Sequence, residues 1–564
     1  MTIPQSTAIM RLIETIDTKT AKESAYNMAE KQENRKWDAE ADIIVVGFGG
    51  SGAAAALEAA QQGASVLVVD RFHGGGATAA SGGIVYAGGG TPYQKAAGYE
   101  DTPEEMYRYL KQEVGDVVTD ETLRLFCEQS PEMIAWMDQE GVPFEGSMCP
   151  FKTSYPTDKY YIYFSGNENH SSYKANAKPA PRGHRARGKG ISGLTLFHAL
   201  EKAVRKQQGI QVRCQTRVER LVFADDGRVT GVEGISISPG ITSRLHGAIS
   251  YINAKLTTYV PPLAKLLHDI DKLLIRLRAR PYRARARKAV ILAAGGFIFN
   301  KQMVKECAPI YLNCLPLGTY GDNGAGIRLG VSAGGVTSHM DKMSAWRFYV
   351  PPEALMQGVL VDKKAQRICS EDLYGAKQGD YIVASGGYAY LIFDSKTYKE
   401  AVSKIGEQCA AFQKLTMIPM LRLTRKKAKS FQKLAAKLKI SPDALEQTMS
   451  RYNAIAGKRE PDPLGKTEKR FVPQDTPPFY AVDCSLKSKS GIPTASMTLG
   501  GLVVNEKTGQ ILRSDSSSVD GLYAVGRNAV GVCSNGYFAS GISISDCIFS
   551  GRRAGKHAAS LPAK

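Results

Sequence analysis

Paired cysteines and long apolar runs are both missing from the sequence. The ten cysteines are scattered, and none stands in a Cys-x-x-Cys or Cys-x-x-Cys-His pattern, so neither a metal centre, a thioredoxin-type pair nor a c-type haem is indicated. No run of about 18 apolar residues occurs, so no membrane-spanning helix is expected. The first residues lack a basic stretch followed by an apolar one, and a cytoplasmic location is therefore expected.

The net charge of +19 is concentrated in one segment. Residues 235–288 hold eleven Lys and Arg against two Asp, or +9. Leucines and an isoleucine recur there at helical spacing, with Lys265, Lys272 and Arg276 on other faces, which predicts a basic amphipathic helix. The apolar positions are Leu263, Leu266, Leu267, Ile270, Leu273, Leu274 and Leu277.

This segment has several possible roles. A basic amphipathic helix can lie in a membrane interface, so 245–288 is a candidate for contact with the inner face of the cytoplasmic membrane. Packing on its own domain and contact with another subunit are the alternatives, and we do not expect nucleic acid as a partner. The Arg-x-Arg alternation that follows the helix can also be the outer face of a strand that enters Ala289–Ala293.

A strand, a glycine turn and a small-residue helix begin at Asp42. The turn reads Gly47-x-Gly49-x-x-Gly52. Its first glycine allows the tight turn, the second lets the backbone approach a pyrophosphate, and the third lets helix and strand pack closely. Asp70 stands 18 residues after Gly52 at the end of a second strand, where an acid binds the ribose 2′-hydroxyl. The pattern predicts dinucleotide binding.

Further glycine-rich segments follow along the chain. They occupy 73–83, 293–296, 322–326, 521–526 and 540–546. Each stands at an expected strand end or helix start, where backbone amides can approach a long ligand. In this order they resemble the fumarate reductase and succinate dehydrogenase flavoprotein superfamily, and the resemblance runs from about 42 to 557.

Within that superfamily the sequence most resembles the 3-ketosteroid dehydrogenases, especially the Δ4-(5α) branch. Segments that carry this narrower likeness include 101–110, 179–184, 338–343 and 498–502. The resemblance implies FAD as the cofactor. It also implies an α/β fold in which a discontinuous Rossmann-like FAD-binding domain carries an inserted α+β substrate (capping) domain.

The domain limits follow from the positions of the motifs. We predict an N-terminal extension at 1–41 and the first part of the FAD-binding domain at 42–310, which includes the basic insertion. The substrate domain is predicted at 311–475, since this range has no nucleotide motif beyond the turn at its start, and the second FAD-binding part at 476–564.

The resemblance implies which residues contact FAD, namely those of the glycine-rich segments and one position on a later strand. They are Gly47, Gly49, Gly50, Ser51, Gly52, Asp70, Arg71, Ala77, Thr78, Ser81, Gly82, Gly83, Val218, Ala294, Gly295, Asn323, Gly526, Arg527, Gly541, Ser543 and Ile544.

Hydroxyl groups are the predicted catalytic residues. Desaturation next to a ketone removes a proton α to the carbonyl and a hydride from the β carbon to flavin N5, which requires a base and donors to the ketone oxygen. By the resemblance, Tyr537, Tyr349 and Ser540 fill these roles. The sequence departs from the family's Tyr-x-Ser-Gly, because Phe538 holds the expected tyrosine position; Tyr349 is likewise one place before the aligned position, which is Val350.

The superfamily contains other activities, and the sequence supports some of them less than others. Fumarate reductases clamp two carboxylates with His and Arg, whereas this chain has Gly375, Ser496 and Phe538 at the aligned positions. Dicarboxylate reduction is therefore not expected. A 3-oxo-5α-steroid 4-dehydrogenase that passes electrons to a quinone or another acceptor is the main hypothesis. A Δ1-dehydrogenase, an enone reductase and a membrane-associated electron-transfer flavoprotein remain alternatives.

Overall fold

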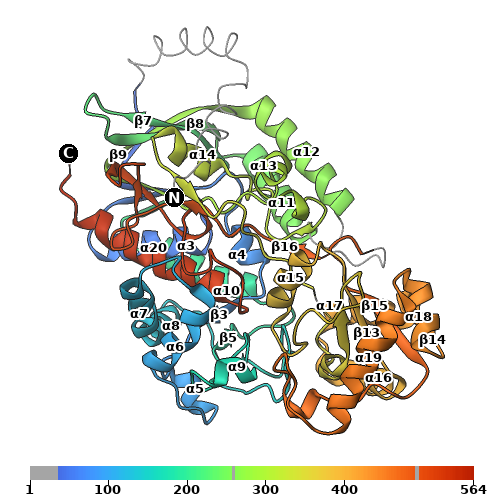
Figure 1. Ribbon diagram of the computed structural model, residues 1–564. Coiled ribbons are helices and arrows are strands. Elements are labelled where there is room, and N and C mark those ends of the chain that lie inside the picture. The colour runs from blue at the N-terminus through green and yellow to red at the C-terminus, as the bar shows by residue number, and fades with distance from the viewer. Residues whose placement is uncertain (1–35, 257–260, 348, 489–493, 564) are drawn as a thin grey trace.

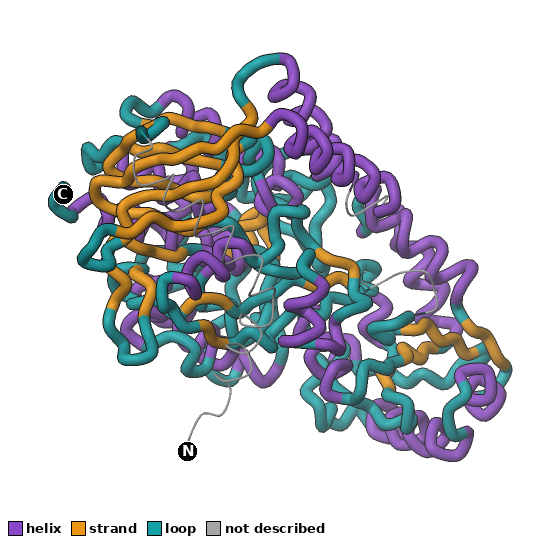
Figure 2. The backbone as a smooth tube through the Cα atoms, turned by 90° about the horizontal axis from the view of Figure 1, so that it is seen from above, coloured by secondary structure: helices purple, strands orange, loops and turns teal. Residues whose placement is uncertain are grey.

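The computed structural model describes residues 36–256, 261–347, 349–488 and 494–563. Most of the predicted N-terminal extension (1–41) lies outside the described residues. The polypeptide forms a large α/β unit and a smaller unit, each with its own sheet, and these sheets lie toward opposite ends of the molecule (Figure 2).

The large sheet is the centre of the large unit, which carries the glycine-rich motifs and is called the FAD-binding unit after its predicted ligand. Its parallel core has the order β19-β9-β1-β2-β6, and β18 and the β7–β8 pair extend it antiparallel. Continuous β-branched runs such as 43–46 and 66–69 are buried, as expected of parallel strands covered on both faces. The strands are β1 (Ala39–Val46), β2 (Val66–Val69), β6 (Ile210–Arg213), β7 (Thr216–Phe223), β8 (Val229–Ile237), β9 (Ala279–Leu292), β18 (Gln510–Leu512) and β19 (Ser518–Ala524).

Two helices from opposite ends of the chain pack together against this sheet. They are α3 (Gly50–Gln61) and α20 (Ile542–Ser560), which lie side by side in Figure 1. Small residues allow the contact, because a Cβ on Gly555 would stand 2.4 Å from the carbonyl oxygen of Ala55. The FAD-binding unit is therefore discontinuous, and the predicted fold class is confirmed.

The capping unit is a four-stranded antiparallel sheet covered by helices. Its order is β12-β13-β15-β14, with a separate apolar core beneath α18 and α19. The bounds are β12 (Val359–Val361), β13 (Tyr390–Phe393), β14 (Lys426–Ala428), β15 (Phe479–Asp483), α15 (Gly375–Ala384), α16 (Ser395–Gln408), α17 (Ala411–Pro419), α18 (Phe431–Leu438) and α19 (Pro442–Gly457). The strand β15 lies beyond the predicted limit at 475. It nevertheless pairs with β13 on one side and β14 on the other, so it belongs to the small sheet. This pairing favours a limit after 483.

A third group of elements links the two units. A sheet of order β3-β5-β4 lies beside the N-terminal half of α20 and helices α5 to α8. These elements are β3 (Ile84–Tyr86), β4 (Ile162–Tyr163), β5 (Gly183–Arg185), α5 (Pro92–Ala96), α6 (Pro103–Val114), α7 (Asp120–Glu128), α8 (Ser130–Gln139) and α9 (Ser171–Lys174). Four other helices lie outside this group, namely α4 (Gly76–Ala80), α10 (Gly193–Lys206), α13 (Lys301–Cys307) and α14 (Ala325–Ser332); α10 packs on α3 and α4, and α14 contacts β7. The short pairs are β10 (Leu315–Pro316) with β16 (Ala495–Ser496) and β11 (Thr337–Ser338) with β17 (Gly501–Leu502).

The basic insertion forms a helix pair that leads back into the large sheet. Its helices are α11 (Ile241–Leu256) and α12 (Pro261–Arg278), so the predicted amphipathic helix is present. The Arg-x-Arg stretch is the start of β9, where Tyr282 and Ala284 are buried and the arginines alternate with them. None of the described helices is long and apolar enough to cross a bilayer.

Candidate active site

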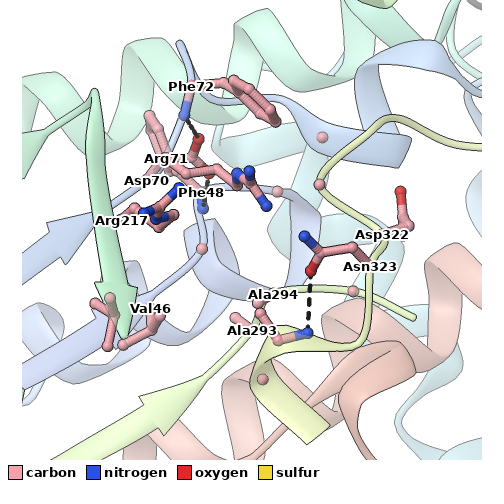
Figure 3. A pocket seen from close by; sticks show the side chains of 18 of the residues that line it. Val46, Phe48, Asp70, Arg71, Phe72, Arg217, Ala293, Ala294, Asp322 and Asn323 are labelled. Atoms are coloured by element: carbon pink, nitrogen blue, oxygen red, sulfur yellow. Dashed lines mark hydrogen bonds between the residues drawn. The ribbon is translucent and has the colours of Figure 1, made fainter. Parts of the chain in front are cut away.

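A cavity of about 810 Å³ lies at the carboxyl ends of β1 and β2. Open α/β sheets bind ligands in this crevice. The cavity is lined by the turn after β1, residues 70–78, the inner face of β7, and the loops at 293–295 and 319–326. Figure 3 shows Asp70, Arg71 and Phe72 on one side of it and Asp322 and Asn323 on the other.

The glycine turn has the geometry that its spacing predicts. Gly47 has φ +111°, and a Cβ on Gly52 would stand 2.0 Å from the Gly47 carbonyl oxygen, so both positions require glycine. Gly49 differs, because a Cβ there would meet no protein atom closer than 3.7 Å and its backbone borders the cavity. The first amides of α3 lie at the same wall, where they and the helix dipole suit a pyrophosphate.

Asp70 is fixed at the end of β2 by two backbone amides. Phe48 N–H donates to one carboxylate oxygen at 2.8 Å and Phe72 N–H to the other at 2.7 Å. Each oxygen keeps a lone pair for a ribose hydroxyl. Arg71 follows directly, and burial lowers the pKa of its guanidinium to about 10.

The opposite wall of the cavity holds a buried ion pair. Arg527 Nη2 donates to Asp322 Oδ1 at 2.5 Å, and both side chains line the cavity. Among the described residues Arg527 Nη1 has no hydrogen-bond partner, although the atom is buried. A buried cationic donor at the cavity wall is suited to an anionic or carbonyl group of a bound cofactor.

The predicted cofactor residues fall into two groups. Those that line the cavity are Gly47, Gly49, Gly50, Ser51, Asp70, Arg71, Ala77, Thr78, Val218, Ala294, Gly295, Asn323 and Arg527. The others are Gly52, Ser81, Gly82, Gly83, Gly526, Gly541, Ser543 and Ile544. Most of the second group lie before β3 or in the first turn of α20, two elements that contact each other. The residues thus extend from Asp70, which is placed to bind a ribose, through the glycine turn that suits a pyrophosphate, to the N-terminus of α20. The length of this arrangement fits FAD.

An aromatic cluster lies at this second end of the site. The ring centroid of Trp346 is 5.6 Å from that of Tyr374 and 5.6 Å from that of Tyr537. The centroids of the two tyrosine rings are 6.3 Å apart. These residues come from the capping unit and from the segment before α20, so the cluster spans the junction of the two units. Such a wall is apolar except for its hydroxyl groups.

Tyr537 stands at the N-terminus of α20. Its hydroxyl accepts the Gly541 N–H at 3.4 Å, and Gly541 is the N-cap of this helix. Burial raises the pKa of Tyr537, whereas the Gly541 amide acts in the opposite direction because it stabilises the phenolate. Among the residues that the structure describes, we find no acceptor for the Tyr537 proton.

Ser540 joins Tyr374 to the backbone of the third group. The Tyr374 and Ser540 hydroxyls are 2.8 Å apart, and Ser540 donates to the Ser154 carbonyl oxygen at 3.1 Å. Since the serine proton goes to Ser154, Tyr374 is the donor in the first bond. Tyr374 was not predicted from the sequence, although it immediately precedes Gly375, one of the positions that speak against fumarate chemistry.

Tyr349 has a different environment from Tyr537. It is buried to 1% exposure, and its hydroxyl donates to the Gln378 side-chain oxygen. Burial raises the pKa of Tyr349 well above its usual value. The hydrogen bonds of the predicted catalytic residues thus bring Ser540 together with Tyr374, whereas Tyr349 is bound within the capping unit.

Sequence reasoning also missed the inner face of the α11–α12 pair. Ser250, Asn253 and Asp271 line the cofactor cavity, although the periodicity pointed only to the leucines of this segment. The sequence feature that could have indicated a polar inner face is the presence of His268 and Asp271 within the apolar helix.

Comparisons with known proteins agree with this geometry. A family model described as FAD binding domain matches residues 42–544. The 3-oxo-5-alpha-steroid 4-dehydrogenase of Comamonas testosteroni is 37% identical over 513 residues, which cover 87% of this chain and 93% of the relative. A 3-oxosteroid 1-dehydrogenase of Mycobacterium tuberculosis is 26% identical over 535 residues, with coverage of 83% and 89%.

A solved structure is also similar over most of its length. It is the 3-ketosteroid-Δ4-(5α)-dehydrogenase from Rhodococcus jostii RHA1 in complex with 4-androstene-3,17-dione, with a TM-score of 0.78 and 31% identity. The match covers 94% of this chain and 98% of the other. The glycine turn, the ribose acid and these matches have one explanation: the chain belongs to the FAD-binding flavoprotein family, with the 3-ketosteroid dehydrogenases among its relatives, and is a FAD-dependent oxidoreductase.

Proposed function

We propose that the protein dehydrogenates a 3-ketosteroid and introduces the Δ4(5α) double bond. The observation that carries this proposal is Tyr537, a buried phenol at the N-terminus of α20, within an aromatic wall at the predicted flavin end of the site. The 37% identical relative bears the name of this activity. The positions at which fumarate reductases clamp carboxylates carry no charge here: Gly375, Ser496 and Phe538.

Tyr537 is the proposed base. Its hydroxyl faces the α20 N-terminus, where an amide and the helix dipole stabilise the phenolate that must take up the α-proton. FAD, when bound, supplies the acceptor for the hydride. The Tyr374–Ser540 pair lies beside the base and holds the Tyr374 ring in place next to it, since Tyr374 donates to Ser540 and Ser540 to the Ser154 carbonyl. Tyr349 has a positioning role through Gln378.

The test is anaerobic reduction of the purified yellow holoenzyme by a panel of 5α-saturated and Δ4 3-ketosteroids. Rapid loss of the oxidised flavin absorbance with the 5α-saturated steroids supports the proposal. Loss only with Δ4 steroids indicates Δ1 chemistry instead. If no steroid reduces the flavin and an enone reoxidises the chemically reduced enzyme, the protein is a reductase and the proposal is wrong.

The electron acceptor is proposed to be a quinone or another acceptor. Within the described residues and the motifs of the sequence there is one dinucleotide fold, and it is assigned to FAD. Turnover with a quinone analogue but not with NAD(P)⁺ is the expected result. A nicotinamide-dependent turnover would contradict this part of the proposal.

We also propose that the outer face of α12 contacts an anionic membrane surface. The predicted leucine stripe does not pack inward: Leu266, Leu273 and Leu277 are 57%, 54% and 67% exposed. Lys272 and Arg276 flank them on the same helix and are exposed as well. An apolar row bordered by cations matches the interface of a bilayer with anionic lipid, in which a sterol-like substrate dissolves.

Vesicle flotation tests this contact. Vesicles that contain phosphatidylglycerol should bind the holoenzyme, and pure phosphatidylcholine vesicles should bind it much more weakly. A stable dimer in solution that hides these leucines, without vesicle binding, would show instead that the face is a subunit contact.

A further inference from the structure

The inner face of the α11–α12 pair carries polar side chains, opposite to the leucines. This inner face consists of His246, Ser250 and Asn253 of α11 and His268 and Asp271 of α12, and all of them are buried. Burying polar groups under an otherwise apolar helix pair is costly unless each finds a partner. Their presence in an amphipathic insertion therefore requires an explanation.

Several of these polar atoms have no hydrogen-bond partner among the described residues. Both ring nitrogens of His246, Nδ1 of His268 and both carboxylate oxygens of Asp271 are in this state. His246 and Asp271 are 0% and 1% exposed, and the shortest approach between them, Nε2 to Oδ1, is 4.0 Å, which is too long for a hydrogen bond. Native proteins rarely leave such groups unpaired, and exceptions mark a missing ligand or water.

Of the unpaired groups, Asp271 lines the cofactor cavity, and His246 is its neighbour, with Nε2 4.0 Å from the Asp271 Oδ1. Asp271, Ser250 and Asn253 line this cavity, and the charges of Arg71 and Asp271 interact. Phe72, which follows the ribose acid by two positions, stacks on the His246 ring at 6.3 Å. His268 in turn stacks on Tyr320 from the opposite loop at 4.0 Å. The helix pair thus closes the cavity over its adenosine end.

We propose that the α11–α12 pair is a cover for the adenosine half of FAD and that Asp271 and His246 are cofactor-binding residues. The Asp271 carboxyl group accepts hydrogen bonds from ribose hydroxyls or the adenine amino group, and the His246 imidazole supplies one donor and one acceptor. Binding then satisfies atoms that the polypeptide leaves unpaired. The insertion contributes to cofactor retention as well as to any surface contact of its outer face.

The chain offers a matched control on the same helix. Asp269 lies two residues before Asp271, but its side chain is 53% exposed and pairs with Lys272. Asp271→Leu and His246→Phe remove the inner polar atoms and enlarge both side chains, and the second keeps an aromatic ring on Phe72. Asp269→Leu makes the corresponding change on the outer face.

The experiment measures FAD release from the holoenzyme on serial dilution, by the rise in flavin fluorescence. Asp271→Leu and His246→Phe should each raise the dissociation constant about tenfold or more, because each removes hydrogen bonds to the cofactor. Asp269→Leu should leave it unchanged. Circular dichroism should show that all three variants keep their secondary structure.

A competition with ADP tests the adenosine assignment. ADP should promote flavin release from the wild type, and it should lose potency in the Asp271→Leu variant by a similar factor. An unchanged dissociation constant for FAD would mean that the inner polar atoms are only hydrated, and the proposal would be wrong. Weaker FAD binding with unaltered ADP potency would overturn the assignment to the adenosine half. Neither readout depends on the steroid, so the proposed function stands or fails separately.

Discussion

Buried phenols in this protein differ in what their hydroxyl groups contact. Tyr537 accepts an amide of the α20 N-terminus, whereas Tyr349 donates to Gln378 and Tyr374 to Ser540. Residue type and burial are the same in all three cases, so the contact alone distinguishes a candidate base from a positioning group. The proposed roles of these three phenols therefore rest on single hydrogen bonds.

Substitution of the proposed base, Tyr537, should affect turnover far more than cofactor binding. Tyr537→Phe keeps the ring on Trp346 but removes the proton acceptor, so the rate of flavin reduction by steroid should fall roughly 100- to 10,000-fold. The flavin spectrum should stay that of the wild type. Tyr349→Phe is the comparison, and its rate should fall much less; equal losses in both variants would contradict the assignment.

Asp546 gives a prediction about pH. Burial raises the pKa of this carboxyl group in α20 to about 6, and Arg553 acts against the rise. The folded state therefore binds the proton more tightly than the unfolded state, whose pKa is near 4. The contribution to stability is complete below about pH 4 and is lost as the pH rises through about 6.

Thermal unfolding of the holoenzyme between pH 4 and 7 measures this effect. Asp546→Asn cannot ionise, so its stability relative to the wild type should increase as the pH rises through this window. A difference between the two proteins that is constant with pH would mean that Asp546 does not titrate there.

At the scale of elements, the β1–α3 turn combines two demands on glycine. Gly52 packs against the Gly47 carbonyl within the protein, whereas Gly49 borders the cavity, and a Cβ there would meet protein atoms only at an ordinary contact distance of 3.7 Å. The first demand concerns folding and the second concerns the ligand. Local spacing specifies both, since they depend on a few consecutive residues.

Alanine substitutions should separate the two demands. Gly52→Ala forces a methyl group into a carbonyl oxygen, so it should destabilise folding by about 1–3 kcal/mol. Gly49→Ala should leave the unfolding of the FAD-free protein unchanged and weaken FAD binding. Thermal unfolding and flavin release measure the two effects. A Gly49→Ala protein that retains FAD like the wild type would show that the pyrophosphate does not approach this position.

At the scale of the whole molecule, the insertion has two faces with different environments. Its inner face lies over the cofactor cavity, and its outer face presents leucines and cations to the surroundings. Arg287 of β9 does not add to the outer face, because it pairs with Asp42 and Glu40 of β1. Part of the basic charge therefore holds the large sheet together.

Vesicle binding should respond differently to the two kinds of side chain on the outer face. Lys272→Glu with Arg276→Glu should weaken binding mainly at low salt, because a Debye length of about 10 Å at 0.1 M screens exposed charges. Leu266→Ser with Leu273→Ser should weaken it at every salt concentration. Steroid turnover in detergent should remain unchanged in both variants. If vesicle binding is also unchanged in both variants, the proposed membrane contact is wrong.

The sequence by itself determined the cofactor, the fold class and the discontinuity of the FAD-binding unit. These depend on glycine turns, strand ends and helix starts, whose geometry is set by neighbouring residues. It also located the amphipathic helix of the insertion, because its period is a local property.

Only the tertiary structure decided which groups meet. Tyr374 and Ser540 are far apart in the chain, and their hydrogen bond exists because the capping unit packs against the segment before α20. The assignment of β15 to the small sheet and the inward orientation of Asp271 likewise depend on long-range packing. A hydrophobic period in the sequence shows that a helix has an apolar and a polar face. Which of the two faces is buried depends on the surrounding structure, and here the polar face is buried because it lies over the cofactor cavity.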